Sequence, residues 1–231
     1  MLAAVVIPSR LDSRRIPRKA LQDLEGLPLI EHVRSRAIAA GVGPVIVATD
    51  SPEIAEVVQS FGGDVWTTGP AASGTHRVAE VARRLDRAIF VNVQGDQPRV
   101  SPFHIRDLVA HMERSGAEIA TVATPLRPGE RDDPAVVKVA MHPGTPVARD
   151  FRRDDAPGFD HRHLGLYAYT REALLRVTSG PVGTRARAEG LEQLTWLEGG
   201  ASIHVVLVDA AASSIDTMVQ LERARATSSG G

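Results

Sequence analysis

Cysteine is missing from this chain of 231 residues. Its absence excludes disulfide bonds, thiolate metal sites and catalysis by a thiol. A strong net charge is missing too, because the formal value is −1, and so we expect no general attraction to nucleic acid or to an anionic membrane. No apolar run approaches the ~18 residues of a membrane-spanning helix, and the N-terminus lacks the pattern of a signal peptide. These absences predict a cytoplasmic protein with neither a nucleic-acid nor a membrane partner.

Two familiar nucleotide-binding motifs are also absent. The segment Gly41-Val42-Gly43-Pro44 does not match the dinucleotide fingerprint, and the sequence contains no Walker A loop. It contains no G-x-S-x-G motif either. The chain is therefore unlike a dehydrogenase or a P-loop kinase.

What the sequence does contain is a basic segment directly after its first apolar run. Residues 3–7 are apolar, and residues 9–19 then carry five cations without a helical or strand period: Arg10, Arg14, Arg15, Arg18 and Lys19. Of the 27 lysines and arginines, only Lys19 and Lys138 are lysines, so a lysine at position 19 indicates a need for a compact point charge. Open α/β sheets bind ligands in loops at the carboxyl ends of their strands, and this charge suits a polyphosphate. The alternative is a solvated basic loop.

Short apolar strands alternate with helical patterns, which predicts an α/β fold with a mostly parallel sheet and crossover helices. Expected strands cover residues 2–8, 45–48, 88–93, 118–123, 162–169 and 203–208. Expected helices cover residues 28–40, 102–115, 184–198 and a stretch from about 216, with two more opened by Ser51-Pro52 and by residues 73–77. Between residues 127 and 160 the alternation stops, apart from a strand-like stretch at 136–139, which predicts an excursion from the sheet.

Several polar residues at strand ends are candidates for chemistry. Asp96 follows a buried strand within a glycine-containing turn, where a carboxylate is placed to hold a hard divalent cation. From its local sequence alone, Asp216 is more typical of a helix N-cap. If the fold brings Asp96 and Asp216 to one point, however, both carboxylates could bind a magnesium ion on a triphosphate. Gln94 carries an amide able to read a pyrimidine edge. Helix N-terminal amides at residues 73–77 suit an anion.

A pair of histidines occurs later in the chain. His161 and His163 lie on one face of a predicted strand, together with Tyr167. No third metal ligand is near them in the sequence, so contact with an acceptor molecule is a better interpretation than a metal site.

Taken together, these segments resemble the CMP-KDO synthetase (3-deoxy-manno-octulosonate cytidylyltransferase) family, along nearly the whole chain. Eight blocks occur in the family's order: Pro8-Ser9-Arg10 with Ser13, Arg15, Ile16, Pro17, Lys19 and Leu21; Val47–Asp50; Ser73–Arg77; Asn92–Pro98; Pro134 with Val137–Val139; Arg162–Tyr167; Glu189 with Leu191–Leu194; and Ile215–Thr217. The resemblance implies a Rossmann-like nucleotidyltransferase that transfers CMP from CTP to a small anionic acceptor and releases pyrophosphate. It also implies a homodimer.

The resemblance implies a role for each matching residue. Lys19, Arg15 and Arg10 would be catalytic and hold the CTP phosphates. The other nucleotide-binding residues would be Pro8, Ser13, Ser73, Thr75, Arg77 and Gln94. Magnesium would be held by Asp96 and Asp216. The acceptor would be bound by Arg162, His163, Tyr167, Arg185, Arg187, Glu189 and Gln193.

On this basis we expect one nucleotidyltransferase domain over residues 1–226. Residues 1–125 would bind CTP, residues 126–200 would form the acceptor-binding and dimerisation excursion, and residues 201–226 would return to the core. Residues 227–231 would be a disordered tail.

The chain departs from the family pattern mainly in the acceptor half. The segment from Lys138 to Arg162 is shorter than in the family, and Arg185 and Arg187 stand where a Pro-Leu-Glu element is expected. A pocket that has lost sugar-reading groups and gained cations favours a smaller, more strongly charged acid. We therefore place a phosphonate such as phosphonoformate, as in antibiotic biosynthesis, slightly ahead of a KDO-like 2-keto sugar acid.

Three other classes of protein compete with this interpretation. A nucleotide-binding regulator with a degenerate site would keep the fold, but the basic loop and both candidate metal aspartates are present. A glycosyltransferase would normally carry Asp-x-Asp after a strand, where this chain has Gln94-Gly95-Asp96. A purely structural module leaves the clustering of charge at strand ends unexplained.

Overall fold

The computed structural model describes residues 3–11, 16–209, 218 and 220–222. Its strands are β1 (Ala3–Ser9), β2 (Asp23–Leu24), β3 (Leu27–Pro28), β4 (Val45–Thr49), β5 (Asp64–Thr67), β6 (Ile89–Asn92), β7 (Ile119–Pro125), β8 (Lys138–Met141), β9 (Ala148–Arg152), β10 (His161–Thr170) and β11 (Ile203–Leu207). Its α-helices are α1 (Leu29–Ala40), α2 (Pro52–Ser60), α3 (Gly74–Arg84), α4 (Pro102–Ser115), α5 (Arg171–Val177), α6 (Thr184–Glu189) and α7 (Gln193–Glu198). A short 3-10 helix, η1, covers Lys19–Leu21.

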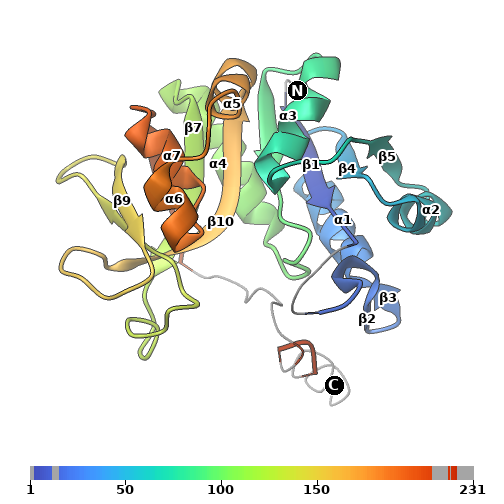
Figure 1. Ribbon diagram of the computed structural model, residues 1–231, viewed down its shortest axis with the longest axis horizontal. Helices are drawn as coiled ribbons and strands as arrows, with labels where there is room; N and C mark the ends of the chain where they lie inside the picture. Colours follow the sequence, from blue (N-terminus) through green and yellow to red (C-terminus); the bar gives the residue numbers. More distant parts are fainter. Residues whose placement is uncertain (1–2, 12–15, 210–217, 219, 223–231) are drawn as a thin grey trace.

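Most of the strands pair in parallel, as the alternation of strands and helices predicts. The order across the sheet is β11-β7-β10-β6-β1-β4-β5 (Figure 1). β1 pairs in parallel with β4 and β6, and β11 with β7, whereas β10 runs antiparallel to both of its neighbours. The carboxyl ends of β1, β4 and β6 therefore meet at one edge of the sheet, which is where α/β sheets bind ligands.

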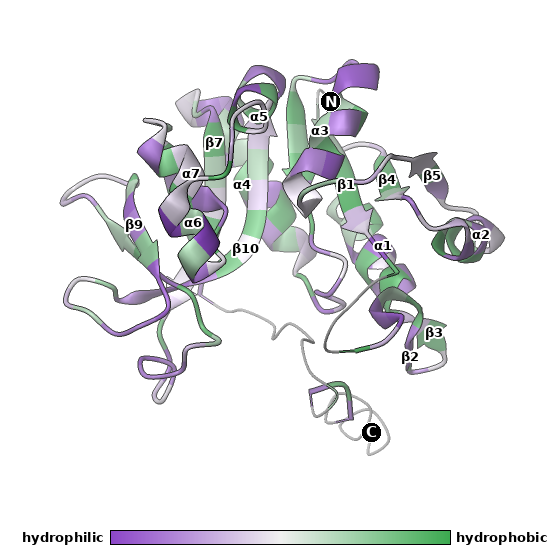
Figure 2. Ribbon diagram, in the orientation of Figure 1, coloured by the Kyte–Doolittle hydropathy of each residue, from purple (hydrophilic) through white to green (hydrophobic). Residues whose placement is uncertain are grey.

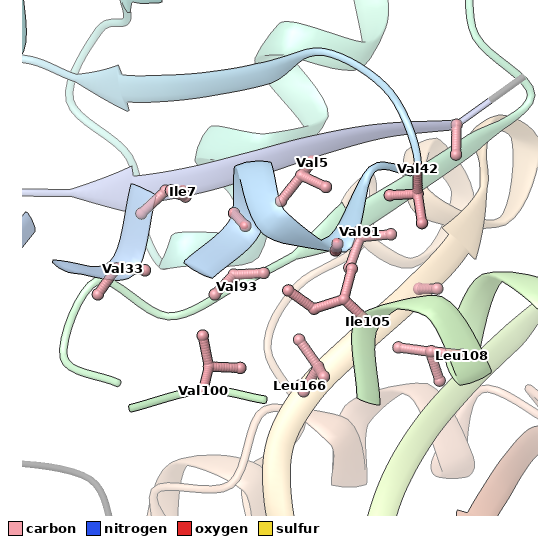
Figure 3. Close-up of a cluster of buried hydrophobic side chains, with 14 of the residues drawn as sticks. Val5, Ile7, Val33, Val42, Val91, Val93, Val100, Ile105, Leu108 and Leu166 are labelled. Atoms are coloured by element: carbon pink, nitrogen blue, oxygen red, sulfur yellow. The ribbon is translucent and has the colours of Figure 1, made fainter. Parts of the chain in front are cut away.

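The side chains of the central strands alternate between two hydrophobic clusters, one on each face of the sheet. In β1, Val5 and Ile7 join the cluster formed with α1, α2 and α4, whereas Ala4 and Val6 join the cluster formed with α3, α5 and α7. Figure 3 shows the first cluster, in which Ile105 of α4 packs beside Val5 and Val91. Both faces of the strands are thus covered, which explains why they are continuously apolar in the sequence and hydrophobic in Figure 2.

Local signals place the helix ends that border the ligand edge. The Ser51 side chain accepts from the Ile54 amide at 3.4 Å, with Pro52 at the first helical position of α2. The Ser73 side chain likewise accepts from the His76 amide at 3.4 Å and begins α3. Both helices begin where the sequence predicts, and the second cap fixes the start of a helix at the ligand edge.

The fold differs from the sequence prediction mainly after residue 126. The expected helix over 184–198 is wrong, because Gly190 adopts a left-handed conformation (φ 64°) and divides the segment into α6 and α7. The excursion contains a second strand that was not predicted, β9, which pairs with β8. The strand expected at 136–139 begins at Lys138. Of the C-terminal helix expected from about 216, Met218 and residues 220–222 are helical; the rest of it, and the tail 227–231, lie outside the described residues.

Within the described part of the chain, every helix is too short or too polar to cross a membrane.

Candidate active site

A cavity of about 440 Å³ lies at the carboxyl ends of β1 and β6 and at the start of α3. Its lining residues are Pro8, Ser9, Arg10, Lys19, Ala20, Ala71, Ala72, Ser73, Gly74, Arg77, Gln94, Gly95 and Asp96. The cavity thus brings together most of the residues predicted to bind CTP, from segments far apart in the sequence. We call it the nucleotide cavity.

Lys19 and Asp96 form a salt bridge in the lining of this cavity. The Lys19 ammonium donates to Asp96 Oδ2 at 2.9 Å, with the lysine side chain 11% exposed and the aspartate side chain 35% exposed. Beside this pair, Gly95 lies close to the end of β1, because a Cβ atom there would lie 3.2 Å from the Pro8 carbonyl oxygen. A point positive charge and a partly exposed carboxylate therefore stand together where a polyphosphate and its counter-ion need them.

Arg77 forms one wall of the nucleotide cavity and is held by three partners. Its guanidinium donates to Asp50 at 2.8 Å, to the Gly69 carbonyl at 3.4 Å and to the Thr68 hydroxyl. The Asp50 carboxylate, directly after β4, neutralises Arg77. Arg77 is almost fully buried, so it has a fixed orientation rather than the freedom of a surface cation.

A second cavity, of about 510 Å³, adjoins the first and shares Ala72, Ser73 and Gln94 with it. It lies between β10, β9 and the helices α6 and α7 (Figure 1). The further polar and aromatic residues that line it are His76, Arg153, His163, Tyr167, Glu192, Gln193, Thr195 and Trp196. Because the two cavities share these lining residues, molecules bound in the two cavities would be neighbours. We call the second one the acceptor cavity.

His163 enters the acceptor cavity as a neutral ring. Burial lowers the pKa of His163 from 6.5 to about 3. Thr121 donates its hydroxyl proton to the Leu166 carbonyl at 2.7 Å, so its oxygen accepts from His163 Nε2 at 2.9 Å. The proton of the ring is therefore on Nε2, and Nδ1 remains an acceptor.

Tyr167 packs against His163, with ring centroids 5.2 Å apart. Burial raises the pKa of the Tyr167 hydroxyl well above its ordinary value, so the group stays protonated. Among the described residues this buried hydroxyl has no hydrogen-bond partner. An unpaired buried donor in the wall of a cavity is suited to a polar ligand, because leaving it unpaired is costly.

Comparisons with known proteins agree with this geometry. A family model described as cytidylyltransferase matches residues 4–225. The 3-deoxy-manno-octulosonate cytidylyltransferases of Methylorubrum extorquens and Azorhizobium caulinodans are 42% and 44% identical to the chain, over 96% of it and 94% of each relative. A solved structure of CMP:2-keto-3-deoxy-manno-octonic acid synthetase complexed with CTP matches with a TM-score of 0.92, at 35% identity over 98% of both chains. The chain belongs to the CMP-KDO synthetase family of cytidylyltransferases.

More distant structures show the fold alone. The 4-diphosphocytidyl-2C-methyl-D-erythritol synthase of Anaerococcus prevotii matches this cytidylyltransferase with a TM-score of 0.67 at 10% identity. The predicted Rossmann-like nucleotidyltransferase fold is therefore confirmed by close and distant structures alike.

Four residues predicted to bind the acceptor line neither of the two cavities in this cytidylyltransferase. Arg162 donates to Glu130 at 2.6 Å, and Arg185 is paired with Asp150 at 2.7 Å and with Glu189 at 3.2 Å. Arg187 donates to the Val182 carbonyl. Glu189 borders a separate surface hollow with Asp132 and Arg153. Carboxylates and a carbonyl hold the three arginines and Arg185 holds Glu189, and the sequence does not reveal such partners.

The other predicted site residues divide into three groups. His163, Tyr167 and Gln193 line the acceptor cavity. Thr75 is fully buried and lies behind the cavities rather than in the wall of the nucleotide cavity. Ser13, Arg15 and Asp216 lie outside the described residues.

Arg153 and Glu192 line the acceptor cavity but were not predicted to do so. Arg153 directly follows β9, and only the pairing of β9 with β8 shows where it lies. Glu192 stands next to Gln193 in the sequence, at the start of α7.

Proposed function

We propose that the protein is a CMP-KDO synthetase, which transfers CMP from CTP to 3-deoxy-manno-octulosonate and releases pyrophosphate. The observation that carries this proposal is the pair of adjoining cavities, one bordered by Lys19 and Asp96 and the other by His163 and Gln193. Relatives with this printed activity are 42–44% identical over nearly the whole chain.

The charge of the acceptor cavity favours the sugar acid over a phosphonate. The preference for a phosphonate depended in part on Arg185 and Arg187, and both are turned to other partners. Arg153 remains as the one arginine among the residues described as lining the cavity, and Glu192 lines it too. A single cation suits one carboxylate better than a dianionic phosphonate, and the amide, hydroxyl and imidazole groups suit sugar hydroxyls.

In the proposed reaction, an acceptor hydroxyl oxygen bonds to the α-phosphorus of CTP and loses its proton to water, as the bond to the pyrophosphate oxygen breaks and pyrophosphate leaves. Lys19 would donate to phosphate oxygens that gain negative charge in this step. The shared wall of the two cavities would hold the attacking oxygen close to the phosphorus, which lowers the entropic cost of the encounter.

Magnesium is part of the proposal. Asp96 fits this role, because its carboxylate is one-third exposed in the nucleotide cavity, and magnesium is commonly held by one or two carboxylates together with substrate phosphates and waters. When bound, the ion would neutralise charge between the triphosphate and an anionic acceptor.

The direct test is pyrophosphate release from CTP and magnesium with KDO, other 2-keto sugar acids and phosphonoformate as separate acceptors. We expect turnover with KDO and none with phosphonoformate. Turnover with phosphonoformate alone would show that the acceptor is a phosphonate and not KDO. Turnover with UTP but not CTP would overturn the assignment of CTP as the nucleotide substrate. The homodimer remains a prediction, which sedimentation of the purified chain would test.

A further inference from the structure

A row of buried hydrogen bonds connects the two cavities. It begins at Gln94, whose Nε2 donates to Asn92 Oδ1 at 3.3 Å. Asn92 Nδ2 donates to Thr75 Oγ1 at 3.3 Å, and the Thr75 hydroxyl donates to Glu192 Oε1. Asn92 and Thr75 are both fully buried, whereas Gln94 borders both cavities and Glu192 borders the acceptor cavity.

The carboxylate at one end sets the direction of the whole row. A carboxylate accepts hydrogen bonds and donates none, so the single hydroxyl proton of Thr75 points to Glu192. The Thr75 oxygen must then accept, which turns the NH₂ group of Asn92 toward it. Asn92 consequently presents its oxygen to Gln94, and Gln94 turns its own NH₂ group inward.

This direction leaves the oxygen of Gln94 facing the nucleotide cavity. The Gln94 Oε1 atom lies 3.6 Å from where a Cβ atom of Gly74 would be, and Pro8 Cγ lies 3.2 Å from the same point. Pro8, Gly74 and Gln94 all line the nucleotide cavity. An amide oxygen is therefore offered in the wall of the nucleotide cavity, next to the point where Gly74 packs against the Pro8 ring.

We propose that Glu192, acting through Thr75 and Asn92, orients the Gln94 amide so that the enzyme accepts cytosine and rejects uracil. Cytosine carries an amino group that donates to such an oxygen, whereas uracil has a carbonyl oxygen at the same position. A reversed amide would favour uracil. Thr75 and Glu192 are positioning residues in this inference, which rests on the proposed use of CTP.

The test measures the ratio of the UTP and CTP dissociation constants by calorimetry in the presence of magnesium. The variants are Thr75→Val, which removes the hydroxyl and keeps the branched shape, and Glu192→Gln, whose NH₂ group allows the row to reverse. We expect the preference for CTP to fall about tenfold in each, the effect of one hydrogen bond. General damage to the fold would weaken binding of both nucleotides equally and leave the ratio unchanged.

Two controls accompany these variants. Thr75→Ser keeps the hydroxyl and should retain the wild-type ratio. Glu118→Gln makes the same chemical change at an exposed carboxylate that is paired with Arg176, and should also retain it. If circular dichroism shows that Thr75→Val does not fold, the inference is tested by the ratio of the UTP and CTP dissociation constants of Glu192→Gln.

The outcomes separate this inference from the proposed function. An unchanged ratio in the folded test variants, or a wild-type protein that does not prefer CTP to UTP, would overturn the inference. A normal preference for CTP without pyrophosphate release from KDO would overturn the proposed acceptor and leave the inference standing.

Discussion

The buried His163 should make the free energy of unfolding depend on pH. Its folded-state pKa is lowered from 6.5 to about 3, so the ring gains a proton in the unfolded chain well before it does in the folded one. The contribution of neutral His163 to the free energy of unfolding is therefore fully present above about pH 6.5 and is lost as the pH falls toward about 3. Between about pH 7 and about pH 5 the loss from this residue alone is about 2 kcal/mol.

The measurement is urea unfolding at these two pH values, followed by tryptophan fluorescence. One of the two tryptophans, Trp196, has its ring 5.1 Å from that of Tyr167. The comparison variant is His163→Gln, which keeps a side-chain donor for Thr121 but does not titrate. Other groups contribute equally to both proteins, so the difference between their two pH dependences isolates His163. Equal pH dependence in the two proteins would refute the reasoning.

Four further substitutions test the site. Lys19→Ala should slow turnover by ~10²–10³-fold, the cost of losing a preorganised donor, and an unchanged kcat at saturating CTP would contradict that role. Asp96→Asn should abolish magnesium-dependent pyrophosphate release, whereas full activity would remove Asp96 from the site. Gly95→Ala would place a Cβ atom 3.2 Å from the Pro8 carbonyl oxygen. The turn should move as a result and raise the KM for CTP about tenfold. A KM equal to that of the wild type would show that the close approach of Gly95 to Pro8 is unimportant for CTP binding. Arg187→Ala should leave the KM for the acceptor within about twofold, and a tenfold rise would return Arg187 to the acceptor site.

The sequence alone determined the strand and helix alternation of the first half and its ligand edge. Buried parallel strands are continuously apolar, and serine caps with proline or glycine mark the helix ends. These elements can therefore be predicted from the order of the residues alone. The carboxyl ends of parallel strands meet at one edge, which is why Lys19, Gln94 and Asp96 could be assigned to one site before any contact was known.

Only the tertiary structure showed which residues of the acceptor half line the acceptor cavity. Whether an arginine enters a cavity depends on which carboxylates fold against it, and Arg185 meets Asp150 from a strand 35 residues away. Gly190 ends α6 through its backbone conformation, although the helical pattern of the sequence continues past it. The link from Glu192 to Gln94 joins three segments distant in the sequence, because hydrogen bonds between side chains depend on proximity in space rather than on order along the chain.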